Sequence, residues 1–82
     1  MKVKVIGPGC KKCQSLEEKV RDIINQLGIR AEVEKVRDLK QIIDYGVLLT
    51  PALVIDGEVK VSGRIPNEKE IIDWLQERAG KR

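Results

Sequence analysis

The sequence contains no histidine and no phenylalanine, and it has one tryptophan and one tyrosine among its 82 residues. With so few aromatic side chains, the core has to be built from valine, isoleucine and leucine. Binding of single-stranded nucleic acid, which uses aromatic side chains to stack on bases, is not indicated. The formal net charge of +3 is also too small to predict nucleic-acid binding by itself.

Long apolar runs are missing as well. No stretch is long enough to cross a bilayer, and Met1 is followed directly by a segment typical of a strand rather than of a secretory signal. We therefore expect a cytoplasmic protein with no membrane partner. Its length predicts a single domain over residues 1–82, a monomer by default.

The apolar periodicity predicts seven elements in the order β-α-β-α-β-β-α. The first half should contain a strand at residues 2–6, a helix that starts at Cys10 and stops at Gly28, and a strand at 31–36. A short helix should follow, opened by a capping box of Asp38 and Gln41 and ended by Gly46, with Leu39, Ile42 and Ile43 as its apolar face.

The second half is predicted from turn and cap signals. Asp56-Gly57 is typical of a tight hairpin turn between strands at 52–55 and 58–61. Asn67 and Glu70 have the spacing of a capping box for a final helix, in which Trp74 should be partly buried. The first β-α-β segment should form a right-handed parallel unit, to which the hairpin adds an antiparallel pair.

Two cysteines, Cys10 and Cys13, are the only ones in the chain, and they stand at the predicted junction of the first strand and helix. Residues three apart on a helix share a face, so a disulfide could close between them. The loop that it closes is very short, so it should stabilise the fold little. A bond of this kind suits a redox couple better than a structural cross-link.

The helix start should make Cys10 acidic. Backbone N–H groups and the helix dipole favour a negative charge there, and Lys11 and Lys12 add two cations. We expect the pKa of Cys10 to fall below the usual value of about 8.5. Cys13 begins the buried stripe and should be shielded. Cys10 is therefore the expected nucleophile, and Cys13 the residue that resolves the mixed disulfide.

Three other interpretations of the cysteine pair remain open. Both cysteines could be inert small hydrophobes. Two thiolates do not complete a zinc site, but they could carry a soft cation such as Cu(I), and the stretch "GPGCKKC" is similar to the loop of heavy-metal-binding domains. Those domains have the order β-α-β-β-α-β, which differs from the order predicted for this chain and argues against a metal carrier. A binding or regulatory module with little turnover is the third possibility.

The chain resembles the thioredoxin/glutaredoxin superfamily, in particular its small archaeal and bacterial members. The motifs that carry the resemblance are Cys10-Lys11-Lys12-Cys13 after a strand, Thr50-Pro51 before the third strand, and Gly63 after the fourth. The resemblance implies a minimal thioredoxin fold of the α/β class, a four-stranded mixed sheet with helices on both faces. It also implies that Pro51 is cis and packs beside the disulfide, and that the Thr50 backbone pairs with an extended substrate segment.

The same resemblance implies a thiol–disulfide oxidoreductase that needs no bound cofactor or metal. Its substrates would be proteins that contain disulfides, and a reductase of the thioredoxin-reductase kind would supply its electrons. Glutathione is less expected, because Arg64, Lys11 and Lys12 are the only candidate anchors that we identify for its carboxylates.

The chain also departs from the family pattern. The residues between the cysteines are neither Gly-Pro nor Pro-Tyr, and no tryptophan precedes Cys10. Thioredoxins carry a buried aspartate six residues before the first cysteine, where it accepts the proton of the resolving thiol. That position is Lys4 here. Either a different group takes the proton, or Lys4 is a cation beneath the cysteine pair that assists thiolate formation. Lys4 could also be a partly solvated lysine on a strand face that the second helix covers incompletely.

Overall fold

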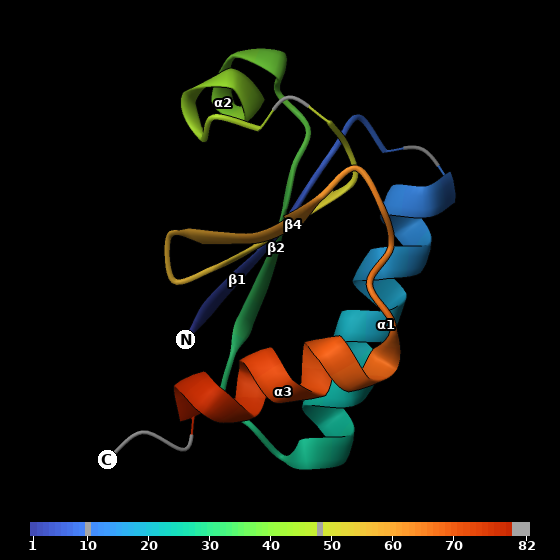
Figure 1. The fold of residues 1–82 in the computed structure, drawn as a ribbon, viewed down its shortest axis with the longest axis vertical. Helices are drawn as coiled ribbons and strands as arrows, with labels where there is room; N and C mark the ends of the chain where they lie inside the picture. Colours follow the sequence, from blue (N-terminus) through green and yellow to red (C-terminus); the bar gives the residue numbers. More distant parts are fainter. Residues whose placement is uncertain (10, 48, 80–82) are drawn as a thin grey trace.

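The computed structural model describes residues 1–9, 11–47 and 49–79, and its elements follow the predicted order (Figure 1). Its helices and strands are β1 (Lys2–Ile6), α1 (Lys11–Leu27), β2 (Glu32–Val36), α2 (Leu39–Asp44), β3 (Ala52–Ile55), β4 (Glu58–Ser62) and α3 (Glu68–Ala79). Each predicted strand and helix is therefore present. The prediction that Cys10 begins the first helix falls outside the described residues.

The strands form one sheet in the order β2-β1-β3-β4. β1 is parallel to β2, and the pairs β1–β3 and β3–β4 are antiparallel. The mixed sheet of the prediction is confirmed. In the parallel pair Val5 lies opposite Lys35, so these two residues share a face of the sheet.

Strand alternation divides the core between the two faces of the sheet. α1 and α3 cover one face and pack against each other, and α2 lies at the other (Figure 1). The first core consists of Val3, Val5, Leu16, Val20, Ile23, Ile24, Leu53, Ile55, Val61, Ile71 and Leu75, and the second of Ile6, Val36, Ile42, Val47, Ala52 and Val54. Helices therefore cover both faces, as expected for a minimal thioredoxin fold.

The short helix α2 differs from its prediction. Ile42 is buried, but Leu39 and Ile43 are 70% and 63% exposed. A helix of six residues directs only one narrow line of side chains at the sheet, and Tyr45 and Val47 after its end fill the remaining space. Its cap also differs, because Asp38 accepts a hydrogen bond from the Lys40 N–H (3.4 Å) instead of that of Gln41.

The turn and cap predictions in the second half are confirmed. Asp56 and Gly57 both have positive φ (48° and 86°), as a tight hairpin turn requires. At the start of α3 the Glu70 N–H donates to the Asn67 Oδ1 (2.8 Å), and the Asn67 N–H donates to the Glu70 Oε1 (3.1 Å). Trp74 is partly buried against the first core.

Candidate active site

The end of β1, the start of α1 and the turn before β3 meet at one end of the molecule, at the top right of Figure 1. Cys13 is the third residue of α1 and is 5% exposed, so the predicted shielding of this thiol is confirmed. Cys10 lies outside the described residues. Its place at the helix start, its pKa and its distance from Cys13 therefore stay predictions.

Gly7, the first residue after β1, packs directly against the Cys13 side chain. A Cβ built on Gly7 would overlap the Cys13 Sγ and would lie 3.5 Å from the Thr50 Cβ. Only a residue without a side chain allows the sulfur, the β1 end and the turn before β3 to approach this closely. The Gly7 N–H donates to the Val36 O (2.9 Å), which anchors this backbone to β2.

The Thr50–Pro51 peptide bond is cis, and Pro51 is buried. The Gly63 N–H, just after β4, donates to the Pro51 O at 2.9 Å. Gly63 has a φ of +86°, and a Cβ on it would meet the Leu49 side chain at 3.0 Å. Thr50 therefore lies beside Gly7, which packs against Cys13, and Gly63 is hydrogen-bonded to the neighbouring Pro51. That Pro51 packs beside a disulfide, and that Thr50 and Gly63 support it, stay predictions.

The turn before α1 is held by two further side chains. Gly9 has a φ of +92°, and its carbonyl accepts a hydrogen bond from the Gln14 amide (3.2 Å). The Arg37 guanidinium lies over Gly9, since a Cβ built there would come within 3.3 Å of it. The sequence pattern gave no signal for Arg37, which comes from the segment after β2.

A small cavity lies behind this turn. Its volume is about 10 Å³, and it is lined by Val5, Gly7, Gly9, Cys13, Gln14, Glu17, Lys35 and Arg37. Cys13 and Glu17 lie one helical turn apart on α1, and Lys35 comes from β2. Sequence reasoning did not single out Glu17 or Lys35. The four-residue spacing of Glu17 from Cys13 was the available signal.

Lys4 does not line this cavity. Its Nζ donates to the Tyr45 hydroxyl and lies 5.2 Å from the centre of that ring. The hydrogen bond to Tyr45 raises the pKa of Lys4. Because Lys4 alternates with Val3 and Val5 along β1, it faces α2 rather than α1. The interpretation as a partly solvated lysine on an incompletely covered face fits the structure, and the interpretation as a cation beneath the cysteine pair does not.

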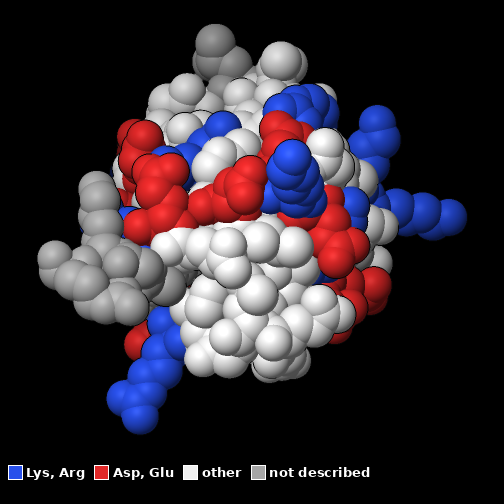
Figure 2. Space-filling view, turned by 60° about the horizontal axis from the view of Figure 1, so that its bottom comes forward, with Lys and Arg blue, Asp and Glu red and all other residues white. Residues whose placement is uncertain are grey.

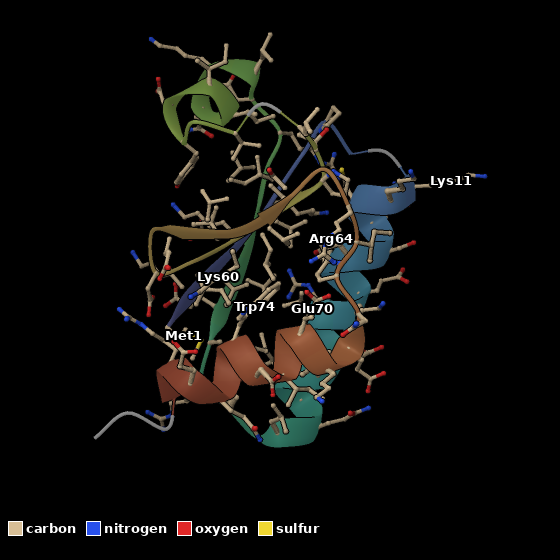
Figure 3. The ribbon with its side chains drawn as sticks, viewed as in Figure 1. Met1, Lys11, Lys60, Arg64, Glu70 and Trp74 are labelled. Atoms are coloured by element: carbon tan, nitrogen blue, oxygen red, sulfur yellow. The ribbon has the colours of Figure 1, made fainter. Side chains whose placement is uncertain are left out.

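The remaining candidate residues are basic and lie at the surface. Lys11 and Lys12 are exposed, and Lys11 extends from the first turn of α1 away from the body of the molecule (Figure 3). Arg64 lies beside Glu70 in the same view and makes two hydrogen bonds to its carboxylate, at 2.9 and 2.7 Å. Arg64 and the Asn67 N–H together lower the pKa of Glu70 to about 2. Arg64 is therefore engaged within the protein and is a poor anchor for a glutathione carboxylate.

Other kinds of site find little support in the described part of the chain. Residues 1–9, 11–47 and 49–79 contain no group of three or more His, Cys, Asp or Glu that could hold a metal ion. No helix among them has the length and apolar character that a membrane span requires. On the face drawn in Figure 2, acidic side chains gather in a band with basic ones among them, beside an uncharged area. This face does not offer the continuous basic surface that nucleic acid would need.

Comparison with known proteins gives one consistent family. The sequence profile of a thioredoxin domain matches residues 1–76. A thioredoxin of Methanothermobacter thermautotrophicus is 42% identical over 71 residues, which are 87% of this chain and 92% of that protein. A thioredoxin of Methanocaldococcus jannaschii is 35% identical over 74 residues, 90% of this chain and 85% of that protein.

Proposed function

This chain belongs to the thioredoxin family, and we propose that it is a thiol–disulfide oxidoreductase that cycles between a Cys10/Cys13 dithiol and a disulfide. Cys10 attacks a disulfide of a substrate protein and forms a mixed disulfide. Cys13 then attacks the Cys10 sulfur, which releases the reduced substrate. No bound cofactor or metal enters this cycle.

One observation carries the proposal, namely the packing of the Cys13 sulfur against Gly7 and beside the Thr50–Pro51 turn. Gly7 leaves room for the sulfur, and the Gly63 N–H fixes the Pro51 carbonyl. An inert hydrophobic cysteine would not need a glycine packed against its sulfur. The sequence adds Cys10 between Gly9 and Lys11, the first residue of α1.

The turn that contains Thr50 and Pro51 is also the proposed site of substrate binding. Thr50 is exposed while Pro51 is buried, so the backbone before β3 can be reached from solvent. We propose that an extended segment of the substrate pairs with Thr50 as an added strand. Lys11 and Lys12 follow Cys10 directly in the sequence, and we propose that their positive charges favour the Cys10 thiolate. Gly63 acts as a support of the Pro51 turn. We expect the electron donor to be a thioredoxin-reductase-type enzyme and the compartment to be the cytoplasm.

The test uses the reduced protein and its two single variants, Cys10→Ser and Cys13→Ser. Alkylation over a series of pH values should show one accessible, acidic thiol at Cys10 and a protected one at Cys13. The wild type should accelerate reduction of a test protein disulfide by dithiothreitol. Cys10→Ser should abolish this acceleration, and Cys13→Ser should accumulate mixed disulfides.

Two alternatives predict different results. A soft-metal carrier would bind one equivalent of Cu(I), lose that binding in both variants and never exchange disulfides. The β-α-β-α-β-β-α order of the structure disfavours it, because the heavy-metal-binding domains have another order. A regulatory module would form the disulfide without accelerating the reduction of the test protein.

A further inference from the structure

The cavity behind the turn before α1 is lined by Cys13, the residue proposed to resolve the mixed disulfide, and by one acidic residue, Glu17. Cys13 and Glu17 both line this space, which at about 10 Å³ has room for one water molecule. Residues four apart on a helix lie on the same face, one turn above the other. Glu17 is only 14% exposed at its side chain, although it lies near the surface.

The groups around Glu17 hold its carboxylate in place. The Arg21 Nε donates to the Glu17 Oε2 at 2.9 Å, and the Lys35 Nζ lies 3.6 Å from the Oε1. Arg37 lines the same cavity. A carboxylate has about four lone-pair sites, so these two contacts leave Glu17 able to accept a further hydrogen bond.

A resolving thiol has to lose its proton before it can attack. Among the described residues that line the cavity, Glu17 is the only carboxylate, and the charged partners Lys35 and Arg37 have no lone pair to offer while protonated. Lys4, at the position where thioredoxins carry an aspartate, faces the other side of the sheet. A base for Cys13 within the protein would therefore have to be another residue.

We propose that Glu17 is the proton acceptor of Cys13, an assignment that rests on the dithiol–disulfide cycle proposed above. The proton leaves the Cys13 Sγ for a Glu17 carboxylate oxygen, directly or through one water molecule. The Cys13 Sγ–Cys10 Sγ bond forms as the bond from Cys10 to the substrate sulfur breaks. The substrate sulfur leaves with the electron pair, and Glu17 returns the proton to solvent or to that thiolate. In the reverse direction Glu17 protonates the departing Cys13 sulfur.

The experiment follows attack and resolution separately. A slight excess of reduced protein is mixed with dithiobisnitrobenzoate, which releases one coloured thiolate when Cys10 attacks and a second when Cys13 resolves the mixed disulfide. Glu17→Gln is compared with Glu18→Gln, a neighbouring exposed residue that lies outside the cavity. At pH 7 the first release should be equal in both variants, and the second should be about 100-fold or more slower in Glu17→Gln alone.

The direction in which Glu17→Gln changes the rate of the second release distinguishes a role of Glu17 as a base from a purely electrostatic role. Removal of a carboxylate beside Lys35 and Arg37 leaves a more positive cavity, which favours the Cys13 thiolate. A purely electrostatic role therefore predicts a second release that is as fast as in Glu18→Gln, or faster, and this result would overturn the assignment. If the wild type shows no release at all, the dithiol–disulfide cycle itself is wrong.

The wild type alone provides a second measurement if Glu17→Gln does not fold. With an internal base, the rate of the second release should change little between about pH 6 and 8. A rate that rises about tenfold per pH unit over this range indicates that hydroxide takes the proton, and it would refute the role of Glu17.

Discussion

Gly7→Ala is the sharpest test of the packing at the candidate active site. Gly7 is buried, and its φ lies outside the left-handed region, so alanine can adopt this backbone. The added Cβ would nevertheless overlap the Cys13 Sγ, whose single χ1 angle leaves it little freedom to move away. The loss of stability expected from the substitution is therefore steric and arises from overlap with the Cys13 Sγ.

The expected magnitude follows from two opposing effects. Overpacking a core site costs about 1–3 kcal/mol, and replacing glycine at a compatible φ returns about 0.4–1 kcal/mol by restricting the unfolded chain. We expect Gly7→Ala to lower the free energy of unfolding by about 1–2 kcal/mol. In a domain of this size each 1 kcal/mol shifts the Tm by about 4–8 °C.

A double-mutant cycle with Cys13→Ala isolates the contact. Without the sulfur, the nearest atoms to the new Cβ are the Cys13 Cβ and the Thr50 Cβ, both at an ordinary 3.5 Å. Gly7→Ala should then cost nothing, or stabilise the variant by about 0.4–1 kcal/mol. Urea unfolding of all four proteins measures the coupling free energy between the two positions. Reducing conditions keep a disulfide out of the comparison. An equal cost in both backgrounds would show that the sulfur does not pack against Gly7.

Two further predictions concern α3 and α2. The pKa of Glu70 is lowered from 4.5 to about 2 by Arg64 and the Asn67 N–H, so its contribution to stability is present above about pH 4.5 and is lost as the pH falls towards 2. Urea unfolding should show that Glu70→Gln is less stable than the wild type at pH 7 and that the difference narrows in acid; a constant difference would contradict this. Ile71→Ala should cost about 2–5 kcal/mol in the same assay, because the residue is 0% exposed, whereas Ile43→Ala at 63% exposure should change stability by less than about 0.5 kcal/mol. A large loss for Ile43→Ala would mean that α2 packs through the face that its sequence predicts.

Features determined by neighbouring residues could be predicted from the sequence. The Asn67–Glu70 capping box and the Asp56-Gly57 hairpin turn each depend on two residues within one turn of chain, and both have the expected geometry. The stripe of α1, which begins at Cys13, is long enough to fix the buried face of that helix. The meeting of Cys13 with the Thr50–Pro51 turn was predicted only through the family resemblance, because some forty residues separate them.

The short helix α2 shows where local pattern fails. Leu39, Ile42 and Ile43 satisfy the spacing of an apolar face, yet only Ile42 is buried. In a six-residue helix the pattern is too short to favour one rotation over another. The rotation of α2 is determined by the space that remains beside the sheet, which Tyr45 and Val47 also fill. That space is a property of the assembled fold and has no signal within the helix itself.

The placement of charge near Cys13 depends on strand register in the same way. Lys4 and Lys35 lie on neighbouring parallel strands, but Lys35 pairs with Val5, one position further along β1. Because successive strand residues point to opposite faces, this single step sends Lys4 towards Tyr45 and Lys35 towards Glu17. A lysine at the position of the thioredoxin aspartate therefore says nothing about charge at the Cys13 sulfur. The charges near Cys13 come instead from Lys35, which is paired with Val5, and from Glu17, one helical turn after Cys13. The base that we propose for Cys13 is therefore a residue on the same side of the sheet.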